Sequence, residues 1–187
     1  MAIVWRKDKP QLLDRVIDDI QTGLERNVPW LDNIFPRAER LVTEQEGVRR
    51  YTPNHYKGRD EYERLLPCDG LGNFCFFTVD DPEQVMGGVG EAAMVTGTFS
   101  LIVWLDMRTV DDGDSRNKEK IEADILRLLD GEYRLRTGRI SVDKVYKRAE
   151  NIFTGFTLDE VSNQYLMAPY AGFRFEGVMM VREMCGL

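Results

Sequence analysis

The chain offers few side chains that could carry catalysis. Its single histidine, His55, lies in the turn-rich segment Tyr51–Tyr56, where a histidine is typical of a surface or hydrogen-bonding role rather than of a general base. One histidine cannot build a histidine-rich metal site within one chain, and none of the four serines lies in a G-x-S-x-G sequence. A Cys–His pair of His55 with Cys68 or Cys75 stays open, although nothing in the sequence favours it.

Two short patterns match ligand-binding motifs in part. Gly88–Ala93 fits G-x-G-x-x-A, but that dinucleotide motif needs a strand before it and a helix after it, and here we expect a loop followed by a long strand. The acidic run Asp111–Asp114 lacks calcium-loop spacing. Clustered carboxylates can also hold magnesium, as in a metal-dependent nuclease, so that reading stays open beside the simpler one of a helix-capping turn. The sequence therefore predicts no cofactor.

Charge separates the chain into segments of opposite sign. The net charge is −7, which disfavours nucleic acid and anionic membranes as main partners. Asp106–Asp114 holds four acids and one base, whereas Glu132–Arg148 holds six bases and two acids. Both segments could be solvated surface, or they could meet on neighbouring subunits, because a head-to-tail assembly needs two different complementary patches. The candidate interface residues are Asp106, Asp111, Asp112, Asp114, Arg134, Arg136, Arg139 and Lys144.

Cysteine usage and hydropathy indicate the compartment. The three cysteines form no C-x-x-C pair, and we expect buried reduced thiols. No stretch approaches the roughly 18 apolar residues that cross a bilayer, and the apolar start is too short for a signal-peptide core. The sequence thus predicts a protein that is cytoplasmic at synthesis.

Hydrophobic periodicity predicts the elements that position these residues. Apolar residues at three- and four-residue steps indicate a helix over about 8–27, capped by Asp8 with Pro10 in its first turn. Alternation over 94–107 predicts a strand about 45 Å long at ~3.3 Å per residue, covered on one face in its first half and on both in its second. Such a strand either spans a bent sheet or carries an arm beyond the core.

The remaining elements complete an α+β pattern. Prolines interrupt the helical patterns of residues 28–70, and the sequence assigns no role to this segment. We expect one α+β domain over 1–187, with a mainly antiparallel sheet, two main helices packed on one face and an extended β arm. The other expected elements are strands at 40–43, 48–52, 73–79, 140–146 and 171–182, a loop at 80–90, a helix at 116–130, and a short helix or irregular crossing at 151–164.

Three phrases, with this order of elements, carry a resemblance. Tyr56–Pro67, Asn73–Pro82 and Gln164–Phe175 are similar to segments of prophage proteins of this length, and the chain resembles tail-terminator and tail-completion proteins of tailed phages. The resemblance implies a virion-associated subunit that forms a ring, typically a hexamer, and meets other phage-like structural proteins. It implies no catalytic residues, so the chain is expected not to be an enzyme. The alternatives are an intracellular binding module of unknown ligand and a carboxylate- or metal-dependent enzyme.

Overall fold

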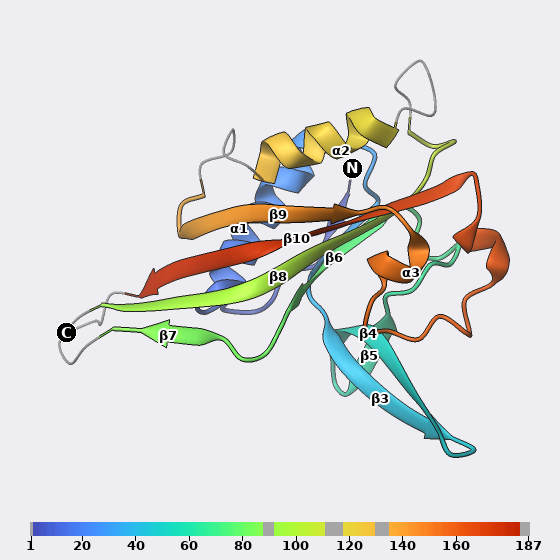
Figure 1. Ribbon diagram of the computed structural model, residues 1–187, viewed down its shortest axis with the longest axis horizontal. Coiled ribbons are helices and arrows are strands. Elements are labelled where there is room, and N and C mark those ends of the chain that lie inside the picture. The colour runs from blue at the N-terminus through green and yellow to red at the C-terminus, as the bar shows by residue number, and fades with distance from the viewer. Residues whose placement is uncertain (1, 88–91, 111–117, 130–134, 184–187) are drawn as a thin grey trace.

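A seven-stranded sheet forms the centre of the computed structural model, which describes residues 2–87, 92–110, 118–129 and 135–183. The expected α+β class with mainly antiparallel pairing is confirmed: in the described sheets, β1 pairs with β2 and β2 with β6 in parallel, and the other pairs are antiparallel (Figure 1). The strands, in spatial order, are β1 (Ile3–Val4), β2 (Asn33–Arg37), β6 (Phe74–Val79), β8 (Ala93–Asp106), β10 (Tyr170–Glu183) and β9 (Gly138–Tyr146), with β7 (Gln84–Met86) beside the start of β8.

Two helices cover one face of this sheet, as expected. Helix α1 (Leu13–Asn27) and helix α2 (Lys118–Arg127) both contribute to one core cluster with the strands (Figure 1). The predicted stripe of α1 is buried from Leu13 to Leu24, because residues three and four apart lie on the same side of a helix.

The predicted start of α1 is wrong. The helix begins at Leu13 rather than near Asp8, and no side chain caps it. Lys9 and Leu12 both have φ of 49°, a left-handed conformation that cannot continue the helical hydrogen-bond ladder. The segment 9–12 is therefore a turn, and Asp8 lies outside the helix.

The long strand β8 behaves as its sequence predicts. Every residue from Phe99 to Leu105 is buried, whereas Thr98 in the first half is exposed. β10 pairs with β8 over its whole length, and the Ala93 end of the pair projects past the helices as an arm (Figure 1). A second core cluster covers the other face around Ile102 and Trp104.

Within residues 28–70, to which the sequence assigned no role, β2 joins the main sheet and residues 39–64 build a second sheet of three strands. It consists of β3 (Glu39–Gln45), β4 (Val48–Gly58) and β5 (Glu61–Arg64). The two strands predicted around Glu46 and Gly47 are confirmed and extend beyond their expected bounds. Both turn residues have positive φ, 53° and 76°, which suits the tight turn between antiparallel strands. The β3–β4 hairpin projects from the body of the molecule (Figure 1).

The structure corrects the prediction for one short segment and decides between the two interpretations left open for another. The predicted loop 80–90 contains β7, which forms because Val85 and its neighbours pair with β8. Around 151–164 lie helix α3 (Ala149–Ile152) and the 3₁₀ helix η2 (Asn163–Leu166), joined by irregular chain. Among the described residues, no helix has the length and apolar character that crossing a membrane requires.

Candidate functional site

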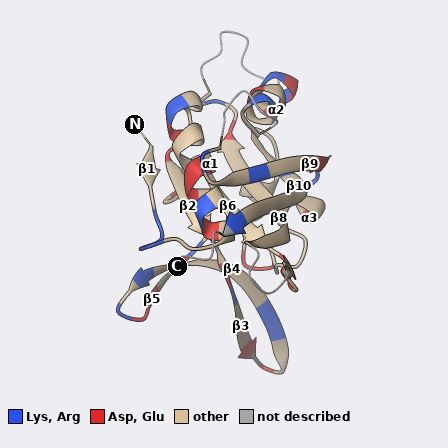
Figure 2. Cartoon of the chain, turned by 90° about the vertical axis from the view of Figure 1, so that its left-hand side faces the viewer, with Lys and Arg blue, Asp and Glu red and all other residues tan. Residues whose placement is uncertain are grey.

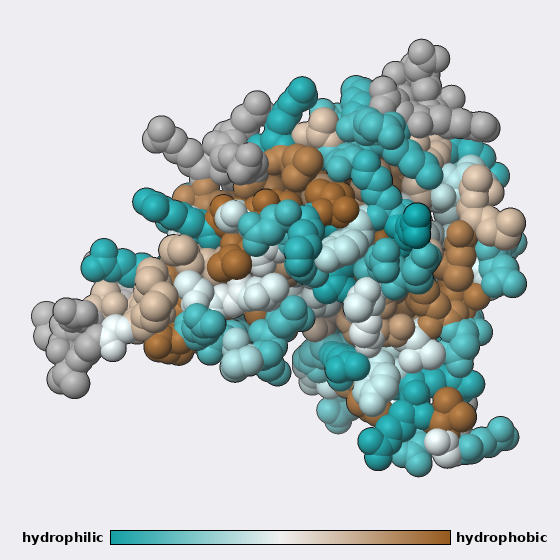
Figure 3. All heavy atoms as spheres, in the orientation of Figure 1, coloured by the Kyte–Doolittle hydropathy of each residue, from teal (hydrophilic) through white to brown (hydrophobic). Residues whose placement is uncertain are grey.

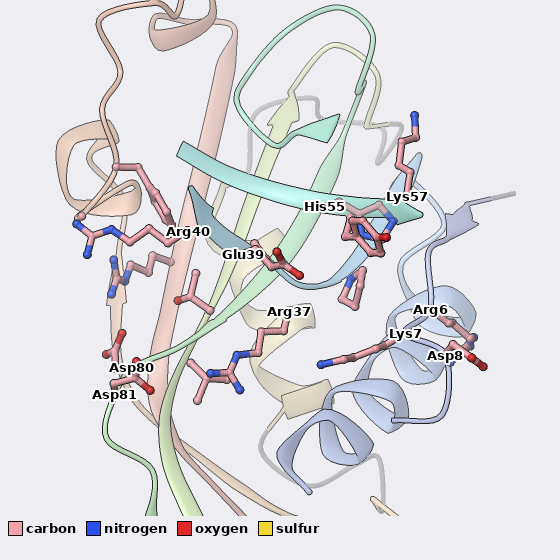
Figure 4. Close-up of a pocket in the computed structure, with 18 of the residues that line it drawn as sticks. Arg6, Lys7, Asp8, Arg37, Glu39, Arg40, His55, Lys57, Asp80 and Asp81 are labelled. Atoms are coloured by element: carbon pink, nitrogen blue, oxygen red, sulfur yellow. The ribbon is translucent and has the colours of Figure 1, made fainter. Parts of the chain in front are cut away.

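A cleft of about 710 Å³ opens where the chain passes from the main sheet to the second sheet. Strand β2 ends at Arg37 and β3 begins at Glu39, so the two sheets diverge at this point and leave space between them. The N-terminal segment, β4 and the segment 154–156 supply the other walls (Figure 4). The charged lining residues are the cations Arg6, Lys7, Arg37, Arg40, Lys57 and Arg174 and the acids Asp8, Glu39, Asp80 and Asp81.

Several of the lining cations are paired with acids that lie outside the lining. Arg37 meets Glu83 at 2.8 Å, and Lys57 meets Glu63 at 3.1 Å. These partly exposed pairs hold the side chains in place and contribute little to the free energy of folding. Arg6, Lys7 and Arg174 are also paired with acids, so the lining is mixed in charge rather than strongly cationic.

Arg174 is the most unusual residue of the cleft. It is 7 % exposed, although the alternation of β10 predicts it on the face away from the core. Its Nη1 donates to the Thr154 carbonyl at 3.2 Å and its Nη2 lies 3.3 Å from Glu176 Oε2, but its buried Nε has no acceptor within the described ranges. A buried guanidinium with a free donor suits an anionic oxygen.

His55 is not in a surface loop, and that expectation is wrong. It lies on β4 and is buried, with the Trp5 and Phe35 rings each 5.4 Å from its own. Burial lowers the pKa of His55, with Lys57 acting in the same direction and Glu63 against it. The imidazole is therefore neutral at pH 7 and forms part of the cleft wall.

The structure argues against a pair of His55 with Cys75. Cys75 lies in the core cluster on the helical side of the sheet, whereas His55 packs on Phe35, which belongs to the cluster on the opposite side. Burial raises the pKa of the Cys75 thiol, so it stays protonated and unreactive. Cys68 is exposed, unlike the buried thiol expected, whereas Cys75 is buried as expected, and neither forms a disulfide in the structure.

The two ligand motifs acquire no support from the described residues. The acidic run 111–114 lies outside the described ranges, and the rest of the described chain holds no group of three or more metal-ligating side chains. Residues 88–91 also lie outside, but strand β8 begins at Ala93, where the dinucleotide motif would need a helix.

Of the eight candidate interface residues, Asp111, Asp112, Asp114 and Arg134 lie outside the described residues. The other four lie on three separate parts of the fold, and no ion pair described joins the acidic segment to the basic one. Asp106 pairs with Arg108 at 2.6 Å, and the hydrogen bond from that guanidinium lowers the pKa of Asp106.

Two of the basic candidate interface residues have ion-pair partners within the chain, and a third is exposed to solvent. Arg136 pairs with Asp19 of α1 at 3.0 Å, and Lys144 lies 3.5 Å from Glu176 of β10. Arg139 is exposed on β9. Arg136 and Lys144 thus already have partners within the chain, whereas Arg139 on the outer strand β9 faces solvent.

Sequence reasoning missed the cleft and the burial of Arg174. One signal pointed to them: Ile102 and Trp104 make the second face of β8 apolar, which requires a covering layer there. Comparison with models of known protein families finds no match, and comparison with curated proteins finds none either. The functional conclusion therefore depends on the geometry of this chain.

Proposed function

We propose that the chain is a non-enzymatic structural protein that assembles with copies of itself and with other proteins of a phage-like tail. The observation that carries the proposal is the β7 end of the main sheet. There, a short strand with exposed apolar side chains borders the projecting end of the β8–β10 pair. The virion-associated role is the one that the resemblance to tail-terminator and tail-completion proteins implies.

The β7 end has the features of a protein contact surface. β7 pairs with β8 on one side, and its other edge is unpaired in the described sheet. Val85 is 69 % exposed and Met86 is also exposed, so two apolar side chains meet solvent beside free backbone groups. Figure 3 shows hydrophobic surface at this end of the molecule. An unpaired edge with apolar side chains is suited to pairing with another chain.

A ring-shaped assembly would use the β7 end as a contact between subunits. In a head-to-tail contact, one surface of a subunit meets a different surface of its neighbour, and rotation closes the ring. The projecting arm would add to a neighbour's sheet, with the outer strand β9 as one acceptor edge because it pairs with β10 alone. Exposed Arg139 on β9 would then lie at the contact.

The test is the mass of the protein in solution, measured by light scattering over a range of concentrations and salt. We expect an oligomer for the wild type and a smaller species for Val85→Lys, because a lysine at the contact adds an unpaired charge. Gln84→Lys is the matched control, since Gln84 is also exposed on β7 but points to the other face. A wild type that stays monomeric at every concentration would refute the proposal.

The cleft favours a second candidate, a binding module for an anionic ligand. Its support is Arg174 in the lining of the cleft, whose buried Nε has no acceptor in the described structure. A ligand that binds the native state raises its melting temperature. Inorganic phosphate and a small dicarboxylate are suitable probes, and Arg174→Lys, which keeps the charge but removes Nε, should reduce the rise. Absence of any rise at millimolar concentrations of either probe would remove this candidate.

A further inference from the structure

Strand β3 has a free edge on the hairpin that projects from the body of the molecule. It pairs with β4 over all seven residues and with no other described strand. Figure 1 shows the hairpin extending into solvent, and Figure 2 shows both basic and acidic residues along it. Val42, in the middle of β3, is 54 % exposed.

The backbone groups that face the free edge follow from the pairing. Tyr51 lies opposite Val42, and its N–H and C=O bond to Thr157 on the far side of β4, at 3.0 and 2.8 Å. Opposed residues of an antiparallel pair either bond to each other or both point away. The N–H and C=O of Val42 therefore point to the free edge, as do those of Arg40 and Glu44, two residues to either side.

Of these three residues, Arg40 and Glu44 carry opposite charges and lie two positions on either side of Val42. If β3 meets a second β3 antiparallel with Val42 opposite Val42, each Arg40 lies opposite the Glu44 of the other copy. The side chains of all three residues lie on one face of the sheet, since alternate residues share a face. The two apolar side chains meet at the centre with an ion pair on each side.

We propose that β3 is a self-pairing edge that joins two copies of this chain about a two-fold axis. The partner is a second copy because Arg40 and Glu44, which carry opposite charges, lie at equal distances on either side of Val42. This contact is a specific form of the self-association proposed above and rests on it, but it uses a different edge from the β7 end. It joins the two hairpins into one continuous sheet, β4–β3–β3–β4.

The charges also select the register. Sliding one strand by two residues in one direction places Arg40 opposite Val42; in the other direction it places Val42 opposite Glu44, and Arg40 opposite Glu46, which lies in the turn beyond the end of β3. Both slides lose the two Arg40–Glu44 pairs. A slide of four residues places Arg40 opposite Arg40, or Glu44 opposite Glu44, and like charges directly opposed are destabilising. A parallel arrangement in register sets like charges side by side.

Within the chain, Glu44 lies 3.4 Å from Arg49 and Arg40 lies over the Tyr51 ring, and both side chains are exposed. The antiparallel register centred on Val42 adds an opposite charge beside each of them and pairs all three outward sets of backbone groups.

Charge reversal tests the contact. Arg40→Glu and Glu44→Arg each place like charges opposite one another twice, and we expect the dissociation constant of the two-fold contact to rise on the order of tenfold. The double variant Arg40→Glu/Glu44→Arg restores opposite charges and should return the constant to near the wild-type value. Both side chains are exposed, and circular dichroism will confirm that the variants fold. Sedimentation equilibrium measures the constant.

A cysteine at position 42 tests the register directly. Directly opposed residues that bond to each other have Cα atoms about 5.5 Å apart, within the range that a disulfide spans. In a background with Cys68 and Cys185 replaced by serine, Val42→Cys should form a disulfide dimer on mild oxidation. Val48→Cys is the control, because Val48 is equally exposed but lies on β4, away from the free edge.

The outcomes separate this inference from the proposed function. One outcome refutes the self-pairing edge and leaves the assembly role standing: the wild type is oligomeric, Val85→Lys disrupts the oligomer, and neither Arg40→Glu nor Val42→Cys has its expected effect. If the wild type is monomeric and Val42→Cys gives no dimer, then both are refuted. Failure of the double variant to restore association also overturns the role of the charges.

Discussion

Replacing Asp19 by alanine should destabilise the fold through the backbone that this carboxylate holds. Asp19 lies on α1 and is 2 % exposed. Its Oδ2 accepts the N–H of Arg136 at 2.8 Å, and the N–H and hydroxyl of Thr137 at 2.9 and 2.8 Å. Its Oδ1 accepts from the Arg136 guanidinium. One carboxylate thus ties the chain just before β9 to the first helix.

The size of the effect follows from which bonds are lost. Asp19→Ala leaves two partly buried backbone donors unsatisfied, each costing about 1–3 kcal/mol, and the better helix propensity of alanine offsets about 0.5 kcal/mol. We expect a net loss of about 1.5–5.5 kcal/mol. Arg136→Ala removes only the guanidinium, which is 76 % exposed, and should cost less than about 1 kcal/mol. Asp19→Asn should fall between the two, because its single oxygen can still accept both backbone N–H groups.

The effect should also depend on pH. Burial acts to raise the pKa of Asp19, but the hydrogen bonds from Thr137 and Arg136 outweigh it and hold the pKa below 3.8. A carboxyl whose pKa is lower in the folded state stabilises the protein above its unfolded pKa, and this contribution is lost as the pH falls through the folded value. The gap between wild type and Asp19→Ala should be constant near neutrality and narrow below about pH 4.

Urea denaturation of the three variants at neutral and acidic pH measures these differences. The order Asp19→Ala, Asp19→Asn, Arg136→Ala, from most to least destabilised, is the expected result. An Arg136→Ala variant as unstable as Asp19→Ala would refute the reasoning, since the ion pair rather than the backbone would then carry the energy. Arg136→Ala also shows whether Arg136, a candidate interface residue, affects assembly apart from its role within the chain.

Two further predictions concern the core. Gly172→Ala should lower the free energy of unfolding, measured by urea denaturation, by about 1–3 kcal/mol. The added Cβ would press on the Trp104 indole and on the backbone of β8, which has no room to shift. An unchanged free energy of unfolding would show that Trp104 can move aside. Cys75 should react with a thiol reagent only on unfolding when the other two cysteines are serine, since its pKa is raised by burial; rapid labelling of the native protein would contradict this.

The elements that could be predicted are those whose signal is local. The stripe of α1 follows from residue spacing, and the two-sided burial of β8 follows from the change at Ile102, where even positions become apolar. The turn at Glu46–Gly47 follows from its residue types. These features depend on neighbours within a few positions, so the sequence alone contains them.

The cleft and the burial of Arg174 depend on contacts between distant segments. Alternation along β10 assigns Arg174 to solvent, and only the segment around Thr154, twenty residues away, covers it. β7 has three residues and no apolar pattern of its own, and it exists as a strand because it pairs with β8. Asp8 seemed a good cap, but the left-handed turn at Lys9 decides the helix start, and no simple pattern indicates that conformation for lysine.

The two proposed contacts together constrain the symmetry of an assembly. A head-to-tail contact at the β7 end generates a ring, and a two-fold contact at β3 pairs each subunit with one in a second ring. Because these surfaces lie on different projections of the molecule, one chain can use both at once (Figure 1). Their combination is dihedral, so the wild type should contain an even number of subunits. At concentrations between the wild-type and variant dissociation constants of the two-fold contact, Arg40→Glu should halve the mass by separating the rings. Val85→Lys should leave two-fold dimers, and the two masses together identify which contact closes the ring.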